Sequence, residues 1–403
     1  MPDWSRIHRE KRFGPWALPL ALFSVLYGLG VRVRLSAYTK GISTRKSLPG
    51  FVISVGNITA GGTGKTPAVA MLAKWAFGEG HRVAILSKGY GGRYKQEVLE
   101  LSDGKRIYAD SQVAGDESVL LARGVSGSPV VISKNRYLAG MYAHKKFGSD
   151  FFILDDGFQH LGLERNLNLA LIDASEPFGN AHLLPWGPLR EPLSQLERAD
   201  AFILTRFSRV GSSERRGQGA KSKAQSAERR GQRAERNAMR HAPCAMRSPQ
   251  ETLAFLKERF PSTPVFCADH IPDKVIFPLS GEAHSPGFLR GKQVLAFAGI
   301  AHPEQFKESL IGLGADVVQF KGFRDHYPFD GDEIRELIRM KERIGARYLL
   351  TTEKDWMRIA PLAFNMAAPM HNDLAYLSVR FAFLPGQEGI FGIIRNGLSD
   401  VEG

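Results

Sequence analysis

The sequence predicts an α/β protein with a parallel sheet covered by helices on both faces, a second, smaller α/β domain and an N-terminal membrane-associated helix. Three observations support this prediction. Short apolar runs alternate with helix-like stretches, which is typical of strands buried on both faces of a parallel sheet. A glycine-rich loop joins one such strand to a helix. The chain has 403 residues, more than one ordinary core accommodates, and its 43% hydrophobic content can supply two cores.

An uncharged stretch over residues 13–31 lies near the N-terminus, with basic residues before it and Arg32 and Arg34 after it. A secretory signal would need a small-residue cleavage site where these arginines stand. A spanning helix needs about 20 apolar residues, which this run barely reaches, and prolines and glycines interrupt it. We therefore expect a helix in the membrane interface, with its arginines on anionic lipid. A spanning helix and a helix buried in the protein's own core stay open as alternatives.

From residue 50 the chain predicts alternating strands and helices. The first predicted strands are short apolar runs at 51–55, 82–87, 150–155, 167–172 and 201–205. A helix is expected over residues 66–77, directly after the glycine-rich loop. A second α/β pattern begins near residue 250, with strands expected at 294–298, 315–320, 348–352 and 375–379 and helices at 303–312 and 331–344.

These patterns divide the chain into four segments. We predict a membrane-associated segment at 1–46, a nucleotide-binding domain at 47–208, a basic low-complexity insertion at 209–247 and a C-terminal α/β domain at 248–403. The insertion is rich in Ser, Gly, Ala, Gln and Arg and has almost no large apolar residue before Met239. It is therefore expected to be a solvated loop, with an RNA-binding arm as the alternative.

The formal net charge of +13 is concentrated in two places. Residues 1–46 hold nine Lys/Arg and two acidic residues, and residues 209–240 hold ten Lys/Arg and three acidic residues. The remainder of the chain is close to neutral, which argues against an enzyme that binds nucleic acid through its core. Cys244 and Cys267 are too few for a disulfide framework and have no metal-like spacing, so a reducing compartment is expected.

The glycine-rich loop is the strongest local motif. It reads Val-Gly-Asn-Ile-Thr-Ala-Gly-Gly-Thr-Gly-Lys-Thr over residues 55–66, between strand and helix, and makes the predicted fold P-loop NTPase-like. Backbone N–H groups of such a loop face phosphate oxygens, while Lys65 can reach the β- and γ-phosphates and the Thr66 hydroxyl can bind Mg²⁺. Thr59 stands where the usual spacing has its first glycine. The residues predicted to bind the nucleotide are Thr59, Ala60, Gly61, Gly62, Thr63, Gly64, Lys65 and Thr66.

An acidic pair ends the apolar run at 150–155. Asp155 and Asp156 precede Gly-Phe-Gln-His, and two carboxylates leaving a buried strand are costly unless a cation or a donor accompanies them. We therefore expect them to bind Mg²⁺, directly or through water, beside the P-loop. A helix N-cap or a turn is the structural alternative, and it accounts for one aspartate better than for two. Arg190 and Glu191 could also face phosphate or metal.

Two further pairs are candidates for acid–base chemistry. Asp116 and Glu117 follow Gly115 and are expected to begin a helix. An acid near the P-loop could accept the proton of an acceptor hydroxyl, although an ordinary first helical turn explains this pair equally well. Asp325 and His326 lie side by side in a turn-like stretch, for which a surface turn is the alternative.

These motifs together resemble the lipid A 4′-kinase family (tetraacyldisaccharide 4′-kinases) along the whole chain. The Thr59-containing P-loop and Asp-Asp-Gly-Phe-Gln-His at 155–160 are the most specific, because other P-loop proteins rarely carry both. Lys88 stands where the family usually has Arg, and Trp186 where a smaller residue is commoner; neither change removes a proposed catalytic group. The other matching motifs are Ser-Lys-Gly-Tyr-Gly-Gly (87–92), Gly-Asp-Glu (115–117), Leu-Leu-Pro-Trp-Gly-Pro-Leu-Arg-Glu (183–191), Ala-Gly-Ile (298–300), Asp-His-Tyr (325–327) and Thr-Thr-Glu-Lys-Asp (351–355).

The resemblance implies transfer of the γ-phosphate of ATP to the 4′-hydroxyl of a tetraacylated glucosamine disaccharide 1-phosphate, with Mg²⁺ required. It places the enzyme at the cytoplasmic face of the bacterial inner membrane, as a peripheral or monotopic protein. Asp116 would be the base, His326 would orient it and Lys65 would act on the phosphates, while Asp155 and Asp156 would serve Mg²⁺. The expected partners are the glycolipid substrate and the membrane surface, and no nucleic acid is expected.

Two other functions could use the same loop. A P-loop ATPase switch of the partition type, bound to nucleic acid or membrane, fits the basic insertion and the doubled glycines but not the near-neutral core and the apolar N-terminus. A ligase or a dethiobiotin-synthetase-like enzyme would need no membrane anchor. ATP consumption that depends on a glycolipid would indicate the kinase, and ATPase activity stimulated by DNA would indicate the switch.

Overall fold

The structure is a computed structural model that describes residues 17–207, 248–363, 373–386 and 388–402. The chain forms two compact units, each assembled from segments far apart in the sequence. Unit 1 contains Met1–Lys65, Asp150–Asp269 and Ala382–Gly403, and unit 2 contains Thr66–Ser149 and His270–Phe381. These units group the chain differently from the four segments predicted from the sequence, whose boundaries stay a prediction. The predicted insertion at 209–247 lies outside the described residues.

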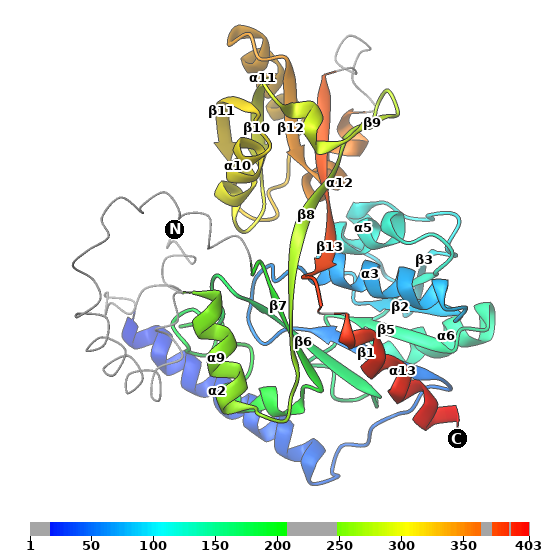
Figure 1. The fold of residues 1–403 in the computed structure, drawn as a ribbon. Coiled ribbons are helices and arrows are strands. Elements are labelled where there is room, and N and C mark those ends of the chain that lie inside the picture. Colours follow the sequence, from blue (N-terminus) through cyan, green and yellow to red (C-terminus); the bar gives the residue numbers. More distant parts are fainter. Residues whose placement is uncertain (1–16, 208–247, 364–372, 387, 403) are drawn as a thin grey trace. The chain divides into compact units, whose positions relative to one another are not determined.

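Unit 1 is built on a parallel sheet with the strand order β5–β1–β6–β7–β8 (Figure 1). β1, β5 and β7 are buried along their whole length, which explains why their sequences are uniformly apolar rather than alternating. The pairing of Val55 with Asp155 brings the carboxyl ends of β1 and β5 together. The strands are β1 (Phe51–Gly56), β5 (Phe151–Asp155), β6 (Leu167–Asp173), β7 (Ala201–Thr205) and β8 (Val265–Phe277), the last of which continues into unit 2.

Helices of unit 1 pack on this sheet. Leu256 of α9 (Pro249–Arg259) belongs to the same buried cluster as Phe202 of β7. α13 (Gly389–Glu402) crosses β1 so closely that a Cβ on Gly397 would lie 3.1 Å from the Phe51 ring (Figure 1). A short 3₁₀ helix, η1 (Leu193–Arg198), precedes β7. The parallel sheet and its covering helices confirm the predicted fold class.

The N-terminal helix α2 (Ala17–Thr39) also belongs to unit 1. It extends past the predicted apolar run, through Arg32 and Arg34, because no helix breaker follows Gly30 before Thr39. Large apolar side chains on it are exposed, including Leu18 at 83% and Leu22 at 62%. By length and composition alone, α2 could cross a membrane. The alternative of a helix buried in the protein's own core is therefore wrong, and the choice between interface and span stays open.

Unit 2 contains two groups of strands. In the first, β2 (Val83–Ser87) pairs parallel with β4 (Val130–Ile132), and β3 (Leu99–Ser102) pairs antiparallel with β4. In the second, β11 (Asp316–Gly322), β10 (Gln293–Ala298), β12 (Tyr348–Thr352) and β13 (Leu374–Phe383) are parallel in this order. A short antiparallel strand, β9 (Glu282–His284), pairs with β8. The sequence did not predict β3, β4 or β9, because runs of three or four residues carry almost no periodicity. It also did not predict β8, whose burial is mixed along its length.

Three helices of unit 2 begin at a residue whose side chain caps the first turn. Asp330 begins α11 with a capping box, in which its side chain accepts from the N–H of Glu333 and the Glu333 side chain accepts in return. α5 and α12 pack against each other, and this contact positions the polar cluster described below. The helices are α3 (Lys65–Gly78), α4 (Ser111–Ala114), α5 (Asp116–Gly124), α6 (Arg136–Phe147), η4 (Pro286–Leu289), α10 (Pro303–Gly312), α11 (Gly331–Arg343) and α12 (Glu353–Ala363).

Candidate functional site

The first half of the P-loop is held by hydrogen bonds to residues 188–190. The N–H of Ala60 donates to the Pro188 carbonyl over 2.6 Å, and the N–H of Arg190 donates to the Ile58 carbonyl over 2.8 Å. Thr59, between them, forms an antiparallel bridge with Leu189, and it is not among the described residues that have a positive φ. A glycine is therefore not required at position 59, which explains why this loop tolerates threonine there.

The second half of the P-loop uses the conformational freedom of glycine. Gly61 has a φ of +130° and Gly64 a φ of +82°, values that other residues rarely adopt. A Cβ built on Gly61 or Gly62 would meet no atom within 4 Å. This stretch therefore presents backbone rather than side chains to open space, which is what phosphate binding by backbone N–H groups requires.

Two residues at the end of β7 fix the carbonyl groups of the loop. Thr205 Oγ1 donates to the Thr63 carbonyl over 3.0 Å, and Arg206 Nη2 donates to the Gly62 carbonyl over 2.9 Å. Arg206 is itself held by an ion pair with Asp173. Because the peptide group is planar, fixing these carbonyls also fixes the direction of the adjoining N–H groups.

Asp156 is the acidic centre of unit 1. Its carboxylate lies 3.3 Å from Lys65 Nζ and accepts from Arg190 Nη1 over 3.0 and 2.8 Å. Lys65 Nζ also donates to Asn57 Oδ1 over 3.1 Å. Burial by itself would raise the pKa of Asp156, but the charges of Lys65 and Arg190 outweigh it and lower the pKa to about 2. The lysine predicted to reach the phosphates is therefore paired with an ionised aspartate.

The two consecutive aspartates lie in different environments. Asp155 ends β5 and is 6% exposed, whereas the side chain of Asp156, which has a φ of +50°, is 36% exposed. Within the described part of the chain, no group of three or more His, Cys, Asp and Glu side chains could hold a metal ion. The role of these aspartates toward Mg²⁺ stays a prediction.

Helix α2 contacts the loops beside Asp156. The Tyr27 hydroxyl donates to the Arg190 carbonyl over 2.9 Å, and Arg34 Nη2 donates to the Gln159 carbonyl over 2.9 Å. Arg190 and Gln159 are hydrogen-bonded to each other through their side chains. The helix with exposed apolar side chains is thus connected, within unit 1, to the loops that hold Asp156.

Asp116 lies in unit 2, where it begins α5 directly after Gly115. Gly115 has a φ of +84°, and a Cβ on it would lie 2.4 Å from the Tyr90 carbonyl, so only glycine fits at this position. Asp116 is 7% exposed, and its Oδ2 lies 3.3 Å from His326 Nδ1. The structure therefore brings together the two residues predicted to act as the base and its partner.

Two cations of α12 complete this cluster. Arg358 Nε and Nη2 donate to Asp116 Oδ2 over 2.9 and 2.5 Å. Lys354 Nζ donates to Glu117 Oε1 over 2.9 Å and lies 3.2 Å from His326 Nε2. Burial by itself would raise the pKa of Asp116, but the His326 hydrogen bond and the charges of Arg358 and Lys354 hold the pKa well below its usual range. Asp116 is consequently an ionised carboxylate at neutral pH.

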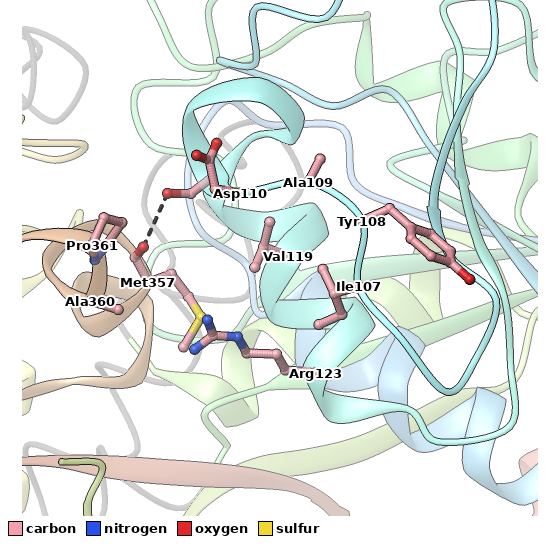
Figure 2. Close-up of a pocket in the computed structure, with 10 residues that line it drawn as sticks. Ile107, Tyr108, Ala109, Asp110, Val119, Arg123, Met357, Ala360 and Pro361 are labelled. Atoms are coloured by element: carbon pink, nitrogen blue, oxygen red, sulfur yellow. Dashed lines mark hydrogen bonds between the residues drawn. The ribbon is translucent and has the colours of Figure 1, made fainter. Parts of the chain in front are cut away.

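A cavity of about 420 Å³ opens beside the α5–α12 contact and is not part of this cluster (Figure 2). None of the predicted site residues lines it. At its edge, Pro361 has no N–H for the Met357 carbonyl, and Ser111 Oγ donates to that carbonyl over 3.0 Å instead. The lining residues are Ile107, Tyr108, Ala109, Asp110, Ser111, Val119, Arg123, Met357, Ala360 and Pro361.

Comparison with known proteins agrees with these features. A family model described as tetraacyldisaccharide-1-P 4′-kinase matches residues 16–398. The chain belongs to the tetraacyldisaccharide-1-P 4′-kinase family. A tetraacyldisaccharide 4′-kinase from Syntrophus aciditrophicus (strain SB) is 39% identical over 383 residues, which cover 95% of this chain and 93% of that protein. A tetraacyldisaccharide 4′-kinase from Chlorobium phaeovibrioides (strain DSM 265 / 1930) is 34% identical over 385 residues, which cover 95% of this chain and 98% of that protein.

A solved structure of a tetraacyldisaccharide-1-P 4′-kinase family protein supports the fold. It is described as the "apo" form of LpxK from Aquifex aeolicus in complex with ATP, and it is 28% identical in sequence with a TM-score of 0.68. The similarity covers 95% of this chain and 99% of that one. The predicted family, fold class and enzyme class, a phosphotransferase with an alcohol acceptor, are therefore confirmed.

Several residues of this tetraacyldisaccharide-1-P 4′-kinase family member that contact the P-loop or Asp116 were not predicted from the sequence. Thr205 and Arg206 were overlooked because they lie at the end of an ordinary buried strand and match no motif. Arg358 was also overlooked, although its spacing of four residues from Lys354 was a usable signal. On a helix, this spacing places both cations on one face, where they could meet the adjacent acids at 116 and 117.

Proposed function

We propose that this chain transfers the γ-phosphate of ATP to the 4′-hydroxyl of a tetraacylated glucosamine disaccharide 1-phosphate. The observation that carries the proposal is the buried, ionised Asp116 beside His326, in a chain that also has a P-loop and matches a kinase family over nearly its whole length. Kinases of this name are 34–39% identical to it, and the solved neighbour is described in complex with ATP. A P-loop ATPase switch is not favoured, because the kinase family model matches residues 16–398.

The P-loop and Lys65 would bind the triphosphate. The fixed carbonyls of Gly62 and Thr63 and the open space at Gly61 support this role. Lys65 pairs with Asp156 through a contact that is partly exposed, so a phosphate oxygen can replace the carboxylate at low cost. Arg190 would then keep Asp156 in place while Lys65 moves to the phosphate.

The donor set fits Mg²⁺. This ion ordinarily takes one or two carboxylates and completes its octahedron with phosphate oxygens and water, so a cluster of three or more carboxylate, imidazole or thiolate ligands is not required. The Thr66 hydroxyl, Asp155 and Asp156 would hold it. When bound, the ion neutralises charge on the phosphates during transfer.

Asp116 would accept the proton of the 4′-hydroxyl, and His326 would orient its carboxylate. An ionised aspartate is a competent acceptor because transfer makes the hydroxyl more acidic as the new O–P bond forms. The low exposure of Asp116 also restricts water that could compete with the sugar hydroxyl for the phosphoryl group.

Helix α2 would hold the enzyme at the cytoplasmic face of the bacterial inner membrane. Its exposed Leu22 and Leu26 support this role, since apolar side chains of this kind bury in the interface or the hydrocarbon region. We expect L22D/L26D to move the protein from the vesicle pellet to the supernatant in co-sedimentation with anionic vesicles. Ile311→Asp, at a 52% exposed apolar residue of α10, is the matched control and should leave the distribution unchanged. Retention of L22D/L26D on vesicles would place the anchor elsewhere.

The proposed activity is tested with labelled ATP and a tetraacylated disaccharide 1-phosphate in detergent micelles, with Mg²⁺ or with EDTA. We expect label in the glycolipid in the presence of Mg²⁺ and none when the glycolipid is omitted. A parallel reaction with DNA in place of the glycolipid tests the ATPase switch. ATP hydrolysis that DNA stimulates, with no labelled lipid, would overturn the proposal.

A further inference from the structure

Two acids and two cations are matched across the α5–α12 contact. Asp116 and Glu117 are consecutive at the start of α5, and Lys354 and Arg358 are four residues apart on α12. Glu117 pairs with Lys354, and Asp116 pairs with Arg358. Only the second pair is closed to solvent, since the side chains of Arg358 and Asp116 are 12% and 8% exposed.

The donors around Asp116 are distributed unequally between its two oxygens. Oδ2 accepts from Arg358 Nε and Nη2 and faces His326 Nδ1, which exhausts its two lone pairs. Oδ1 accepts one bond, from the N–H of Glu117 over 3.1 Å. The second lone pair of Oδ1 receives no hydrogen bond from the described residues.

Arg358 is held in place independently of Asp116. Its Nη1 donates to the Gly299 carbonyl over 2.9 Å and to Asp355 Oδ1 over 2.8 Å. Asp355 is fully buried, and its other oxygen accepts from the N–H of Gly299 and from Thr352 Oγ1 over 3.0 and 2.7 Å. The direction of the guanidinium is therefore set by the loop after β10 and the start of α12.

We propose that Arg358 is a positioning residue that engages Oδ2 of Asp116, so that Oδ1 is the oxygen that accepts the proton of the acceptor hydroxyl. The inference rests on the proposed function and specifies the atom that performs it. The hydroxyl proton moves to Oδ1, the hydroxyl oxygen forms a bond to the γ-phosphorus, and the bond from that phosphorus to the β–γ bridging oxygen breaks. ADP leaves with the bonding electrons.

Because charged groups surround Asp116, the inference predicts a change in the pH dependence of kcat. The groups that face the carboxylate are His326, Arg358 and Lys354, and together they lower its pKa. Glu117, on the same helix, carries the opposing negative charge. Removing the guanidinium raises the pKa of Asp116, so the base becomes protonated at a higher pH and the acidic limb of kcat moves upward.

The test compares R358M and R358K with R335M, a control at an exposed arginine of α11 that pairs with Asp332. R358M should lower kcat by about tenfold to hundredfold, leave the KM for ATP within about twofold and move the acidic limb to higher pH. R358K keeps the charge but loses the forked donors, so it should restore the position of the limb and only part of kcat. A wild-type kcat and pH profile in R358M would overturn the inference.

A thermal double-mutant cycle tests the Asp116–Arg358 pair without any activity. D116N and R358M should each lower the melting temperature, and the double variant should lose less than the sum of the two, because neither charge is then left buried alone. Additive losses would overturn the inference even if the enzyme is active. If wild-type protein instead lacks glycolipid-dependent transfer, the proposed function fails, and the cycle still reports whether the pair is coupled.

Discussion

Unit 1 and unit 2 each contain an aspartate held by cations, and the two differ in exposure. The side chain of Asp156 is 36% exposed and pairs with Lys65 and Arg190. The side chain of Asp116 is 8% exposed and is held by Arg358 and His326. The Lys65–Asp156 pair is only partly open to solvent, with Lys65 11% and Asp156 36% exposed, and a phosphate oxygen that replaced the carboxylate would bring the same negative charge to Lys65. Breaking a buried pair costs about 3–5 kcal/mol, so Asp116 keeps its geometry. The first cluster suits ligand exchange, and the second suits a fixed base.

The largest expected effect is that of a substitution in the Lys65–Asp156 pair. Lys65→Met removes the cation that is proposed to reach the transferred phosphate, so kcat/KM should fall by about 10³-fold, and nucleotide affinity should weaken. Steady-state kinetics and titration with a fluorescent ATP analogue measure the two effects. The fold should survive, since Asp156 retains Arg190. Activity close to wild type would remove the P-loop lysine from the mechanism.

The second largest effect is expected for a substitution in the buried Asp116–Arg358 pair. Asp116→Asn keeps the shape of the side chain but removes the proton acceptor, so kcat should fall by about 10²-fold or more. Nucleotide affinity should stay unchanged, because the nucleotide-binding residues of the P-loop are intact. The same two measurements apply, and a variant that loses affinity rather than kcat would assign Asp116 to binding instead of proton transfer.

The smallest effect concerns Glu353, the acid that begins α12 beside Lys354. Burial raises the pKa of Glu353 to about 7, and Lys74 offsets this only in part. The folded protein therefore binds more protons than the unfolded chain between about pH 4.5 and 7, so stability falls as pH rises through this window. Glu353→Gln should raise the free energy of unfolding at pH 8 by up to about 3 kcal/mol and leave it nearly unchanged at pH 4.5.

Differential scanning calorimetry at both pH values checks this prediction, with Glu336→Gln on the exposed face of α11 as the matched control. The control should show no pH-dependent gain. A gain for Glu353→Gln that is equal at both pH values would mean that desolvation of the charged form is not its cause.

Local motifs in the sequence predicted much of unit 1. Its strands at 51–55, 167–172 and 201–205 were found to within one residue, because such buried strands are almost uniformly apolar. Lys65 could be identified from the sequence because the P-loop is a motif of consecutive residues. The pairing of Lys65 with Asp156 could be anticipated, since both follow neighbouring parallel strands.

The sequence by itself determined the family, the parallel sheet and the residue types at the phosphate loop, because each depends on short-range patterns. The tertiary structure decided which oxygen of Asp116 is engaged, since Arg358 lies 242 positions away along the chain and reaches it only when α12 packs on α5. It also decided the opposite shifts in the pKa values of Asp116 and Glu353. Burial raises the pKa of both carboxyls; at Asp116 the His326 hydrogen bond and the charges of Arg358 and Lys354 outweigh it, whereas at half-buried Glu353 the more weakly acting Lys74 does not.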